Sequence, residues 1–549
     1  MLAYFGRGDG KTAFDHFVST PPRVVAVDTE TVSTTDRTLL GIGVAIDKDT
    51  AFYVTPDEGE RFWRVIEILR DSAVKTVYHN APFDLRVLRE YKVDYRNIDD
   101  TAIMARLKYG WAVLEDVAMR ECMIEVESAG AYLDRYGAKD MRNTPSDALA
   151  QKCAVDATAT YAIWETLWDD TNPEYYSVEI RVASLLEKIS QRGLRLDQER
   201  REFLHTYYTR EKGFLLEIAR GMGFNPGSPQ QVGFILQKRH NFLPLTKGKR
   251  ALKTDDAVLR KLNDPVAGMV ILYRLYTRLI GNYLEPWRGV MRAYTTMHMD
   301  AITGRVSSSN AGKLEPDRNL MNVPKKAELP SAPYPVRSCI VPDADVMTRM
   351  DVNQIELRVL AYLSGDKNMS TVYATEGGDI HAETMTAMSA IRDIAKTFNF
   401  AMVYLGSAST IADHLGTSDI GRVHRYMQAW LAHYDGAAKW MTSQTVEGIR
   451  AGYVETMYGR RMPIPFERGE NHARSCCVNY PVQGTAAEIF KRMMLECEDL
   501  LDDTLLPIHD EYLFDGDQRS RLDVEALSHV SPIYTPVEID VMSRWGEKA

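Results

Sequence analysis

The sequence predicts a multidomain protein of the α/β and α+β classes, and three observations support this prediction. Short apolar segments at 24–28, 39–45 and 51–54 predict buried strands that precede a series of helices. Helical periodicity then dominates from about residue 176 to residue 300 and ends in a predicted helix over 266–295. Short strands alternate with longer helices from there to the end. At about 150 residues per domain, a length of 549 residues predicts three or four domains.

The composition excludes several classes of protein. Lys and Arg number 66 against 76 Asp and Glu, which gives a formal charge of −10. A uniformly basic nucleic-acid coat is therefore excluded, and any site for a polyanion must be local. The six cysteines lack the paired spacing of a zinc site, which favours a reduced, cytoplasmic protein. Membrane association is not expected, because no apolar run approaches the length of about 20 residues that a span requires.

The first unit contains four acidic residues that suggest a metal site. Asp28 and Glu30 end the first strand, and alternation along a strand places both on one face, with Thr29 on the other. Two adjacent carboxylates repel each other unless a cation lies between them. Together with Asp84 and Asp156, they could supply the oxygen ligands that two Mg²⁺ ions prefer. Taken singly, each acid is more simply a surface residue or a helix cap.

The order of these acids resembles that of DEDD-type 3′–5′ exonucleases. The resemblance covers residues 20–172 and implies a ribonuclease H-like domain that hydrolyses a DNA 3′ end with two metal ions, and it adds Asn80 and Phe83 to the site. That family has a Tyr four residues before the last Asp or a His five before it, but here those positions hold Lys152 and Gln151. We therefore expect a weak exonuclease, and a domain kept only for its fold is the alternative.

A second carboxylate set lies in the C-terminal half. In VMTRMDVNQIELRVLAYLSGD (346–366), an apolar strand ends at Asp351 and a helix follows. In LLPIHDEYLFD (505–515), the pattern predicts two strands joined by a bend. The bend brings together His509, Asp510 and Glu511. Each segment alone is weakly specific, because acids at strand ends are common.

A predicted helix at 391–406 carries cations and aromatic rings where a core helix would carry aliphatic residues. At about 100° per residue, positions four apart form one slowly turning stripe. The stripe consists of Arg392, Lys396, Phe400 and Tyr404. Cations suit a triphosphate and aromatic rings suit a sugar and a base. A solvated charged face is the alternative, which the neighbouring acids disfavour.

These three segments closely resemble motifs A, B and C of the bacterial DNA polymerase I family, family A. Further family features follow in order: TGRVSSSN (303–310), GGDIH (377–381), GYVETMYGRRMPIP (452–465) and NYPVQGTAAEIFKR (479–492). The resemblance covers residues 20–549 and implies a right-hand polymerase behind an exonuclease-like domain. The implied domains are exonuclease 1–172, thumb 173–300, palm 301–370 and 441–549, and fingers 371–440. The arrangement, without the 5′-nuclease domain of larger members, resembles a bacteriophage polymerase that acts in an infected bacterium.

The resemblance also implies roles for individual residues. Asp351 and Asp510 would hold two Mg²⁺, with Mn²⁺ as a substitute, and Glu511 would support them. The residues that would bind the dNTP are Gln354, Glu356, His381, Arg392, Lys396, Phe400 and Tyr404. Lys396 would also donate a proton to pyrophosphate. The residues that would contact the primer–template are Arg305, Asn479, Gln483 and His509.

A basic segment at 238–261 stands out in this acidic protein. It holds eight Lys or Arg and two Asp, a net charge of +6. Alone it is most simply a solvated loop. The resemblance instead implies a thumb tip that grips DNA phosphates without reading sequence, through Lys247, Lys249 and Arg250.

The expected partners are primer–template DNA and dNTPs, with the chain acting as a monomer. No processivity partner is indicated by the sequence. A different class of function is a catalytically silent DNA-binding scaffold of the replisome. It is disfavoured because a scaffold has no chemical need for Asp351, Asp510, Lys396 and Arg392.

Overall fold

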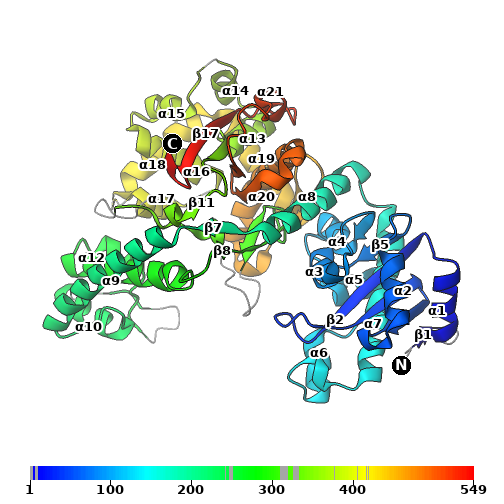
Figure 1. Cartoon of the computed structure of the whole chain (residues 1–549). Coiled ribbons are helices and arrows are strands. Elements are labelled where there is room, and N and C mark those ends of the chain that lie inside the picture. The colour runs from blue at the N-terminus through cyan, green and yellow to red at the C-terminus, as the bar shows by residue number, and fades with distance from the viewer. Residues whose placement is uncertain are drawn as a thin grey trace.

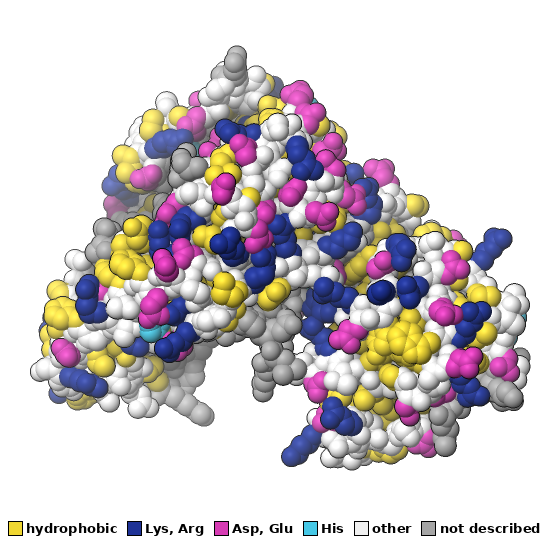
Figure 2. All heavy atoms as spheres, viewed as in Figure 1, with side chains coloured by type: hydrophobic (Ala, Val, Ile, Leu, Met, Phe, Trp, Pro, Cys, Tyr) yellow, Lys and Arg dark blue, Asp and Glu magenta, His cyan; other side chains and the backbone are white. Residues whose placement is uncertain are grey.

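The chain forms an arch in the computed structural model, which describes residues 4–6, 10–240, 243–245, 251–309, 319–324, 333–375, 377–404, 406–415, 417 and 419–548. An N-terminal α/β domain forms one leg and a helical arm forms the other, and the remaining elements join them at the top (Figure 1). Figure 2 shows that this face of the molecule is hollowed between the legs, with Lys and Arg side chains gathered along the upper edge of the hollow.

The N-terminal domain is built on a six-stranded mixed sheet with the strand order β1-β4-β3-β2-β5-β6. The three strands predicted from the apolar segments are confirmed as β2 (Val24–Thr31), β3 (Leu39–Asp47) and β4 (Thr50–Val54). The others are β1 (Tyr4–Gly6), β5 (Lys75–Tyr78) and β6 (Ile98–Asp100). β2 pairs antiparallel with β3 and parallel with β5, so it lies inside the sheet.

Helix α7 (Ser146–Trp168) lies close against this sheet because the contact is made of small side chains. Its Ala154 and Ala157 pack in one cluster with Ala26 and Ala45 of the strands. The close approach brings the polar side chains of α7 next to β2. The other helices of the domain are α1 (Gly10–Ser19), α2 (Glu60–Leu69), α3 (Ala81–Leu88), α4 (Thr101–Tyr109), α5 (Leu114–Cys122) and α6 (Ala129–Tyr136).

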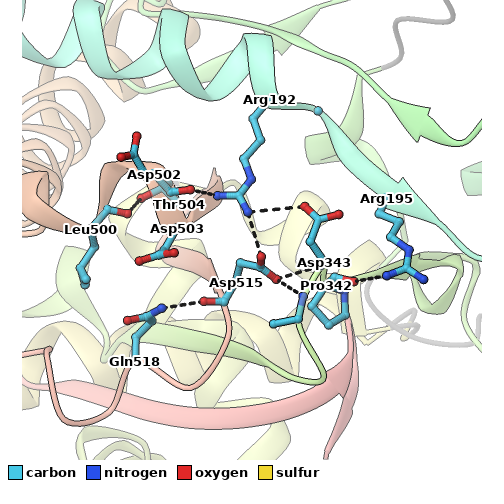
Figure 3. A network of polar contacts seen from close by, with 12 residues as sticks. Arg192, Arg195, Pro342, Asp343, Leu500, Asp502, Asp503, Thr504, Asp515 and Gln518 are labelled. Carbon is cyan, nitrogen blue, oxygen red and sulfur yellow. Dashed lines mark hydrogen bonds and ion pairs between the residues drawn. The ribbon is translucent and has the colours of Figure 1, made fainter.

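Helix α8 (Pro173–Arg192) connects the N-terminal domain to the top of the arch. Its first turn is capped by Asn172, whose side chain accepts a hydrogen bond from the Tyr175 amide at 3.2 Å. At its last residue, Arg192 donates to the Asp502 carbonyl and lies 2.8 Å from Asp515 Oδ2 (Figure 3). The Asp515 carboxylate also accepts from two backbone amides, at 2.8 and 3.0 Å. The end of α8 is thus tied to the sheet that contains Asp515.

The helical arm consists of α9 (Gln198–Gly221), α10 (Pro229–His240), α11 (Asp256–Lys261) and α12 (Pro265–Leu279). The prediction of one helix over 266–295 is wrong in its second half. α12 ends at Leu279 and a π-helical turn, Ile280–Leu284, follows. Pro286 then removes a backbone donor and Gly289 adopts a φ of 70°, which together end the helical path. The strands β8 (Arg292–Ala293) and β9 (Thr296–His298) come next.

A five-stranded sheet with the order β15-β16-β12-β17-β18, called the central sheet below, lies at the top of the arch. The strand predicted before Asp351 and the two strands predicted over 505–515 are confirmed. The bounds are β12 (Met347–Val352), β15 (Thr504–Ile508), β16 (Glu511–Asp515), β17 (Val537–Arg544) and β18 (Glu547–Lys548). Smaller sheets contain β7 (Leu194–Leu196), β10 (Ser307–Ser309), β11 (Ile340–Val341), β13 (Tyr453–Glu455) and β14 (Arg461–Pro463).

Helices pack around this sheet and form one continuous apolar core with it. They are α13 (Ile355–Ser364), α14 (Lys367–Ala374), α15 (Ile380–Met388), α16 (Arg392–Val403), α17 (Ala408–Leu415), α18 (Ile420–His433), α19 (Asp435–Ala451), α20 (Glu470–Glu496) and α21 (Val524–Ser528). The longest, α20, packs against α8, α13 and α19. It therefore joins the linking helix to the elements that carry the predicted motifs.

A buried charged network lies where α8, α20 and the β13–β14 hairpin meet. Lys491 Nζ lies 2.6 and 2.9 Å from the two oxygens of Glu179, and Arg460 Nη2 lies 3.0 Å from the same carboxylate. All three side chains are at most 2% exposed. Glu488 completes the network by accepting a hydrogen bond from the Tyr175 hydroxyl. Both bases lie beside Glu179, and Arg460 lies 3.9 Å from Glu488, so each base in the group has a carboxylate next to it.

The network gives the stability of the fold a pH dependence. Burial raises the pKa of the Glu488 carboxyl to about 7. The pKa of Glu488 in the folded state is therefore higher than in the unfolded state. This group favours folding below about pH 4, and its contribution to stability is lost as the pH rises through 7. Glu488→Gln keeps the acceptor without the charge. It should stabilise the protein by about 1–2 kcal/mol near pH 8 and by less near pH 5. Urea unfolding at both pH values checks this, and a variant less stable than wild type near pH 8 contradicts it.

Candidate active sites

A cavity of about 530 Å³ lies beside the central sheet, between it and helices α13, α16 and α20. Eleven of the residues predicted for the polymerase site line it: Arg305, Asp351, Gln354, Glu356, His381, Arg392, Lys396, Phe400, Tyr404, His509 and Asp510. Phe490 and two alanines of α20, to which the sequence analysis gave no role, also line it. The fold thus gathers carboxylates, cations and aromatic rings from distant parts of the chain around one space.

Two carboxylates open to this cavity from the central sheet. Asp351 lies near the end of β12 and is partly exposed, and Asp510 lies exposed in the two-residue turn between β15 and β16. His509 in the same turn adopts a φ of 55°, which closes the turn tightly. Glu511 pairs with Asp351 across the sheet and is 3% exposed. Accessible carboxylate oxygens fit a hard divalent cation, with Glu511 packed beneath them.

Arg349 contacts these acids and is not among the residues predicted from the sequence. Its Nη1 lies 3.4 Å from Asp351 Oδ2 and 3.6 Å from Glu511 Oε1, and its Nη2 lies 2.5 Å from Asp540 Oδ2. The guanidinium therefore partly neutralises three carboxylates on neighbouring strands. Its signal in the sequence is the two-residue spacing from Asp351, which places both side chains on the same face of β12.

Helix α16 presents Arg392, Lys396 and Phe400 to the cavity. The prediction that the helix continues to residue 406 is wrong, because α16 ends at Val403 and Tyr404 has φ −90° and ψ 7°. The amide of Gly406 bonds to the carbonyl of Ala401 at 2.9 Å, a closure that ends helices. Tyr404 lines the cavity all the same.

His381 is placed by α15 beside the ring of Phe400, with ring centroids 6.0 Å apart. Its Nδ1 lies 2.9 Å from Asn399 Nδ2, which fixes the orientation of the imidazole. Burial lowers the pKa of this histidine. Arg392 Nη2 lies 2.5 Å from Asp379 Oδ2, and Asp379 also caps α15 by accepting from the His381 amide. Cations and imidazole are thus held on one wall.

Glu356 connects two sides of the cavity. Its carboxylate accepts hydrogen bonds from Arg305 and from the Tyr404 hydroxyl, the latter at 3.2 Å. Gly304, directly before Arg305, has a φ of 66°, and a Cβ there would lie 2.7 Å from the Arg460 guanidinium. The turn that carries Arg305 therefore requires glycine and rests on the buried charged network.

Gln354 is part of the cavity lining, and the other predicted residues lie outside the lining or outside the described part of the chain. Gln354 precedes α13 with a φ of 54° and accepts from the Tyr373 hydroxyl at 3.1 Å. Asn479 and Gln483 lie partly exposed on α20 and do not line the cavity. Asn479 Oδ1 is buried and has no hydrogen-bond partner among the described residues. Lys247, Lys249 and Arg250 fall outside those residues.

Three of the four acids of the N-terminal domain are buried, Asp28 is half-buried, and all four lie close enough to affect one another. Burial and the charges of Asp156, Glu30 and Asp84 raise the pKa of Asp28 well above its usual value. Burial raises the pKa of Asp84 to about 7. Asp84 Oδ1 accepts from the amide and the hydroxyl of Thr29, at 2.9 and 2.7 Å. Carboxylates held this close together with little solvent are either compensated by cations or take up protons.

Lys152 supplies one such cation. Its Nζ lies 2.9 Å from Glu30 Oε1 and 2.6 Å from Asp156 Oδ2, and it joins β2 to α7. The neighbouring Cys153 donates from Sγ to Asp28 Oδ2 at 3.2 Å. Among the described residues, ligand atoms close enough for one shared metal come from Asp28, Glu30 and Cys153. A thiol and an ammonium within the cluster do not fit the all-oxygen, two-metal site that the sequence predicts.

Asn80 and Phe83 line a separate cavity of about 400 Å³, between the N-terminal domain and the β9 region. Asn80 adopts a φ of 77°, and its amide donates to Asp100 Oδ1 at 3.0 Å. Arginines and acids both line this cavity, among them Arg86 paired with Glu187 and Arg106 paired with Asp300. It lies on the side of the domain that faces the rest of the arch.

Comparisons with known proteins agree with this geometry. The chain is 29% identical over 531 residues to DNA polymerase I of Chloroflexus aurantiacus, a match that covers 86% of this chain and 55% of that protein. It is 31% identical over 408 residues to a thermostable DNA polymerase I of Thermus thermophilus, covering 67% of this chain and 47% of that protein. The chain thus spans about half the length of the curated relatives it matches. In its described part, no helix is long and apolar enough to cross a membrane.

The fold is similar to that of a solved structure, the POL domain of Pol1 from M. smegmatis in complex with DNA primer-template and dNTP. The TM-score is 0.78 at 22% identity, and the match covers 95% of each chain. Residues 12–172 match the family model described as 3′-5′ exonuclease, and residues 195–546 match the one described as DNA polymerase family A. Both kinds of domain are metal-dependent. The chain therefore belongs to DNA polymerase family A, with a 3′–5′ exonuclease domain ahead of its polymerase domain.

Proposed function

We propose that the protein is a DNA-dependent DNA polymerase that adds dNMPs to a primer 3′ end. The observation that carries this proposal is the 530 Å³ cavity, where accessible carboxylates face cations and aromatic rings. Acids suit metal ions, cations suit a triphosphate, and rings suit a sugar and a base. The proposed parts are an exonuclease domain (1–172), a thumb (173–300), a palm (301–370 and 441–549) and fingers (371–440).

In the palm, Asp351 and Asp510 are the proposed metal ligands. Two Mg²⁺ there would activate the primer 3′-hydroxyl and neutralise charge on the triphosphate. Glu511 and Arg349 hold Asp351 in place, since both lie beside it on neighbouring or shared strands. His509, in the same turn as Asp510, would contact the primer terminus.

The fingers side binds the nucleotide. Lys396 and Arg392 attract the triphosphate, His381 adds a phosphate contact, and Lys396 donates a proton to the leaving pyrophosphate. Phe400 stacks on the sugar. The residues that shape the rest of the nucleotide pocket are Gln354, Glu356 and Tyr404. Glu356, held by Arg305 and Tyr404, excludes a 2′-hydroxyl and so selects deoxynucleotides.

DNA occupies the hollow between the legs of the arch. The Lys and Arg side chains along its upper edge favour phosphate binding (Figure 2). Arg305, Asn479 and Gln483 contact the minor-groove edge, where all Watson–Crick pairs present acceptors in similar places. The unpartnered Oδ1 of Asn479 supports this role among the described residues. Lys247, Lys249 and Arg250 would grip the duplex from the thumb.

The exonuclease activity is proposed to be weak. Asp28, Glu30, Asp84 and Asp156 match the family order, with Asn80 and Phe83 beside them in sequence. As placed, however, they do not fit two divalent ions, because Lys152 binds two of the four carboxylates.

Phe400→Tyr should relax discrimination against dideoxynucleotides at least about tenfold. A phenol at this position can hydrogen-bond near the sugar and replace a contact that the missing 3′-hydroxyl no longer makes. Chain-termination gels with a fixed ratio of ddNTP to dNTP measure this. Phe398→Tyr is not a suitable control because Phe398 is fully buried. Phe466→Tyr, on an exposed ring, is suitable. Unchanged dideoxynucleotide use in Phe400→Tyr contradicts the assignment.

A primer–template incubated with Mg²⁺, with and without dNTPs, tests the proposal on a denaturing gel. The expected result is extension with dNTPs and slow or absent 3′ shortening without them. DNA binding in a gel shift without any extension would instead support the silent scaffold.

A further inference from the structure

Lys152 occupies the centre of the exonuclease carboxylate cluster. Its side chain is 10% exposed, and those of Glu30 and Asp156 are each 7% exposed. The two acids come from different elements, β2 and α7, so the ammonium joins the strand to the helix. A divalent ion bridging the same two carboxylates would make the same connection.

The surroundings of Lys152 show that the cluster still has capacity for a cation. Asp28 of β2 lies near Lys152, and Asp84 of α3 lies near Asp28, so one ammonium serves a cluster of four acids. Asp156 is buried, and its Oδ1 has no hydrogen-bond partner among the described residues. An orphaned carboxylate oxygen in a buried site is a vacant ligand position. The position is therefore shaped for a metal but filled by a side chain.

We propose that Lys152 is a built-in cation that holds Glu30 and Asp156 together in place of a divalent metal ion, so that the cluster stays closed without one. The inference rests on the proposed weak exonuclease and gives its cause. It predicts that the domain needs no metal for stability, and that removing the ammonium creates a metal dependence that the wild-type domain lacks.

Metal binding tests this in the full-length chain. Asp351→Asn and Asp510→Asn are introduced first, so that the palm does not contribute. In that background, the chain with Lys152→Met is then compared with the chain that keeps Lys152. Lys48→Met, which changes an exposed lysine of the same domain, is the matched control. Bound Mn²⁺ is counted by electron paramagnetic resonance, and the melting temperature is measured in EDTA and in Mn²⁺.

The expected result is one more tightly bound Mn²⁺ in Lys152→Met than in the Lys152 chain and the Lys48→Met control. The melting temperature of Lys152→Met should fall in EDTA and recover in Mn²⁺, while that of the other two chains is the same in both. Equal Mn²⁺ counts, or equal recovery in all three chains, overturns the proposal. If Lys152→Met does not fold, Lys152→Gln, which keeps one donor toward Glu30, is read by the same two criteria.

An activity measurement separates this inference from the proposed polymerase. Lys152→Tyr, made with the palm intact, removes the cation and places a Tyr where the exonuclease family has one. Shortening of a single-stranded oligonucleotide from its 3′ end should become at least about tenfold faster. Primer extension is followed in the same preparations. If the variant extends the primer but shortens the oligonucleotide no faster than wild type, only the proposed role of Lys152 is overturned. If a chain with an unmodified palm does not extend the primer, the proposed polymerase activity is overturned.

Discussion

Asp510→Asn should reduce the rate of primer extension by at least about a thousandfold. Asp510 is exposed in the turn between β15 and β16 and opens to the cavity beside Asp351. An amide keeps the size of the side chain but loses the negative charge, so the metal ions that position and activate the reacting groups are held poorly. Single-turnover extension of a labelled primer by one dNTP measures the effect.

An exposed carboxylate beyond the other end of β16 provides the control for this experiment. Asp517 follows β16, is exposed, and pairs with Arg519, which is also exposed. Asp517→Asn should extend the primer like wild type, because an exposed surface ion pair contributes little. The two-metal assignment is wrong if Asp510→Asn and Asp517→Asn extend equally well.

Lys396→Ala should lower kcat/KM for dNTP incorporation about a hundredfold or more. Lys396 is exposed on α16 at the cavity wall, one turn from Arg392 and one turn from Phe400. Removing its ammonium takes away a charge that acts on the triphosphate and on the leaving group, so both dNTP binding and the rate should suffer. Incorporation measured over a range of dNTP concentrations separates the two effects.

Lys367→Ala serves as the matched variant, because Lys367 is an exposed lysine at the start of the neighbouring helix α14 and does not line the cavity. It should leave both kinetic parameters within about twofold of wild type. A Lys396→Ala enzyme with the same kcat/KM as Lys367→Ala would show that the triphosphate is bound elsewhere.

Much of the fold was predictable because local patterns coincided with long-range packing. The strands β2, β3 and β4 are short apolar runs that are buried inside a sheet, so burial and propensity agree. The strands around 505–515 and the helix that carries Lys396 followed from periodicity in the same way. The cavity then depended only on the tertiary contacts that bring these segments together.

The errors and omissions arise where tertiary contacts decide. The predicted helix over 266–295 ran on past Leu279 because apolar side chains continue there, yet Pro286 and Gly289 break the backbone path. The contacts of Arg349 depend on which strands are neighbours, which residue spacing alone does not give. The sequence shows Lys152 only as a departure from a family pattern. Its bridge between β2 and α7 depends on how closely the helix approaches the sheet.

Template-directed incorporation tests the central claim most directly. Each dNTP is offered singly, with Mg²⁺, to four primer–templates that differ only in the first templating base, and the first-nucleotide rate is measured. Among the four dNTPs, the cavity predicts fast extension by the complementary one alone. When the complementary ribonucleotide is offered in a parallel reaction, extension should be much slower, because Glu356 closes the space beside the sugar. Extension that is independent of the templating base, or no extension with any of the four, would contradict the assignment of this cavity as a polymerase active site.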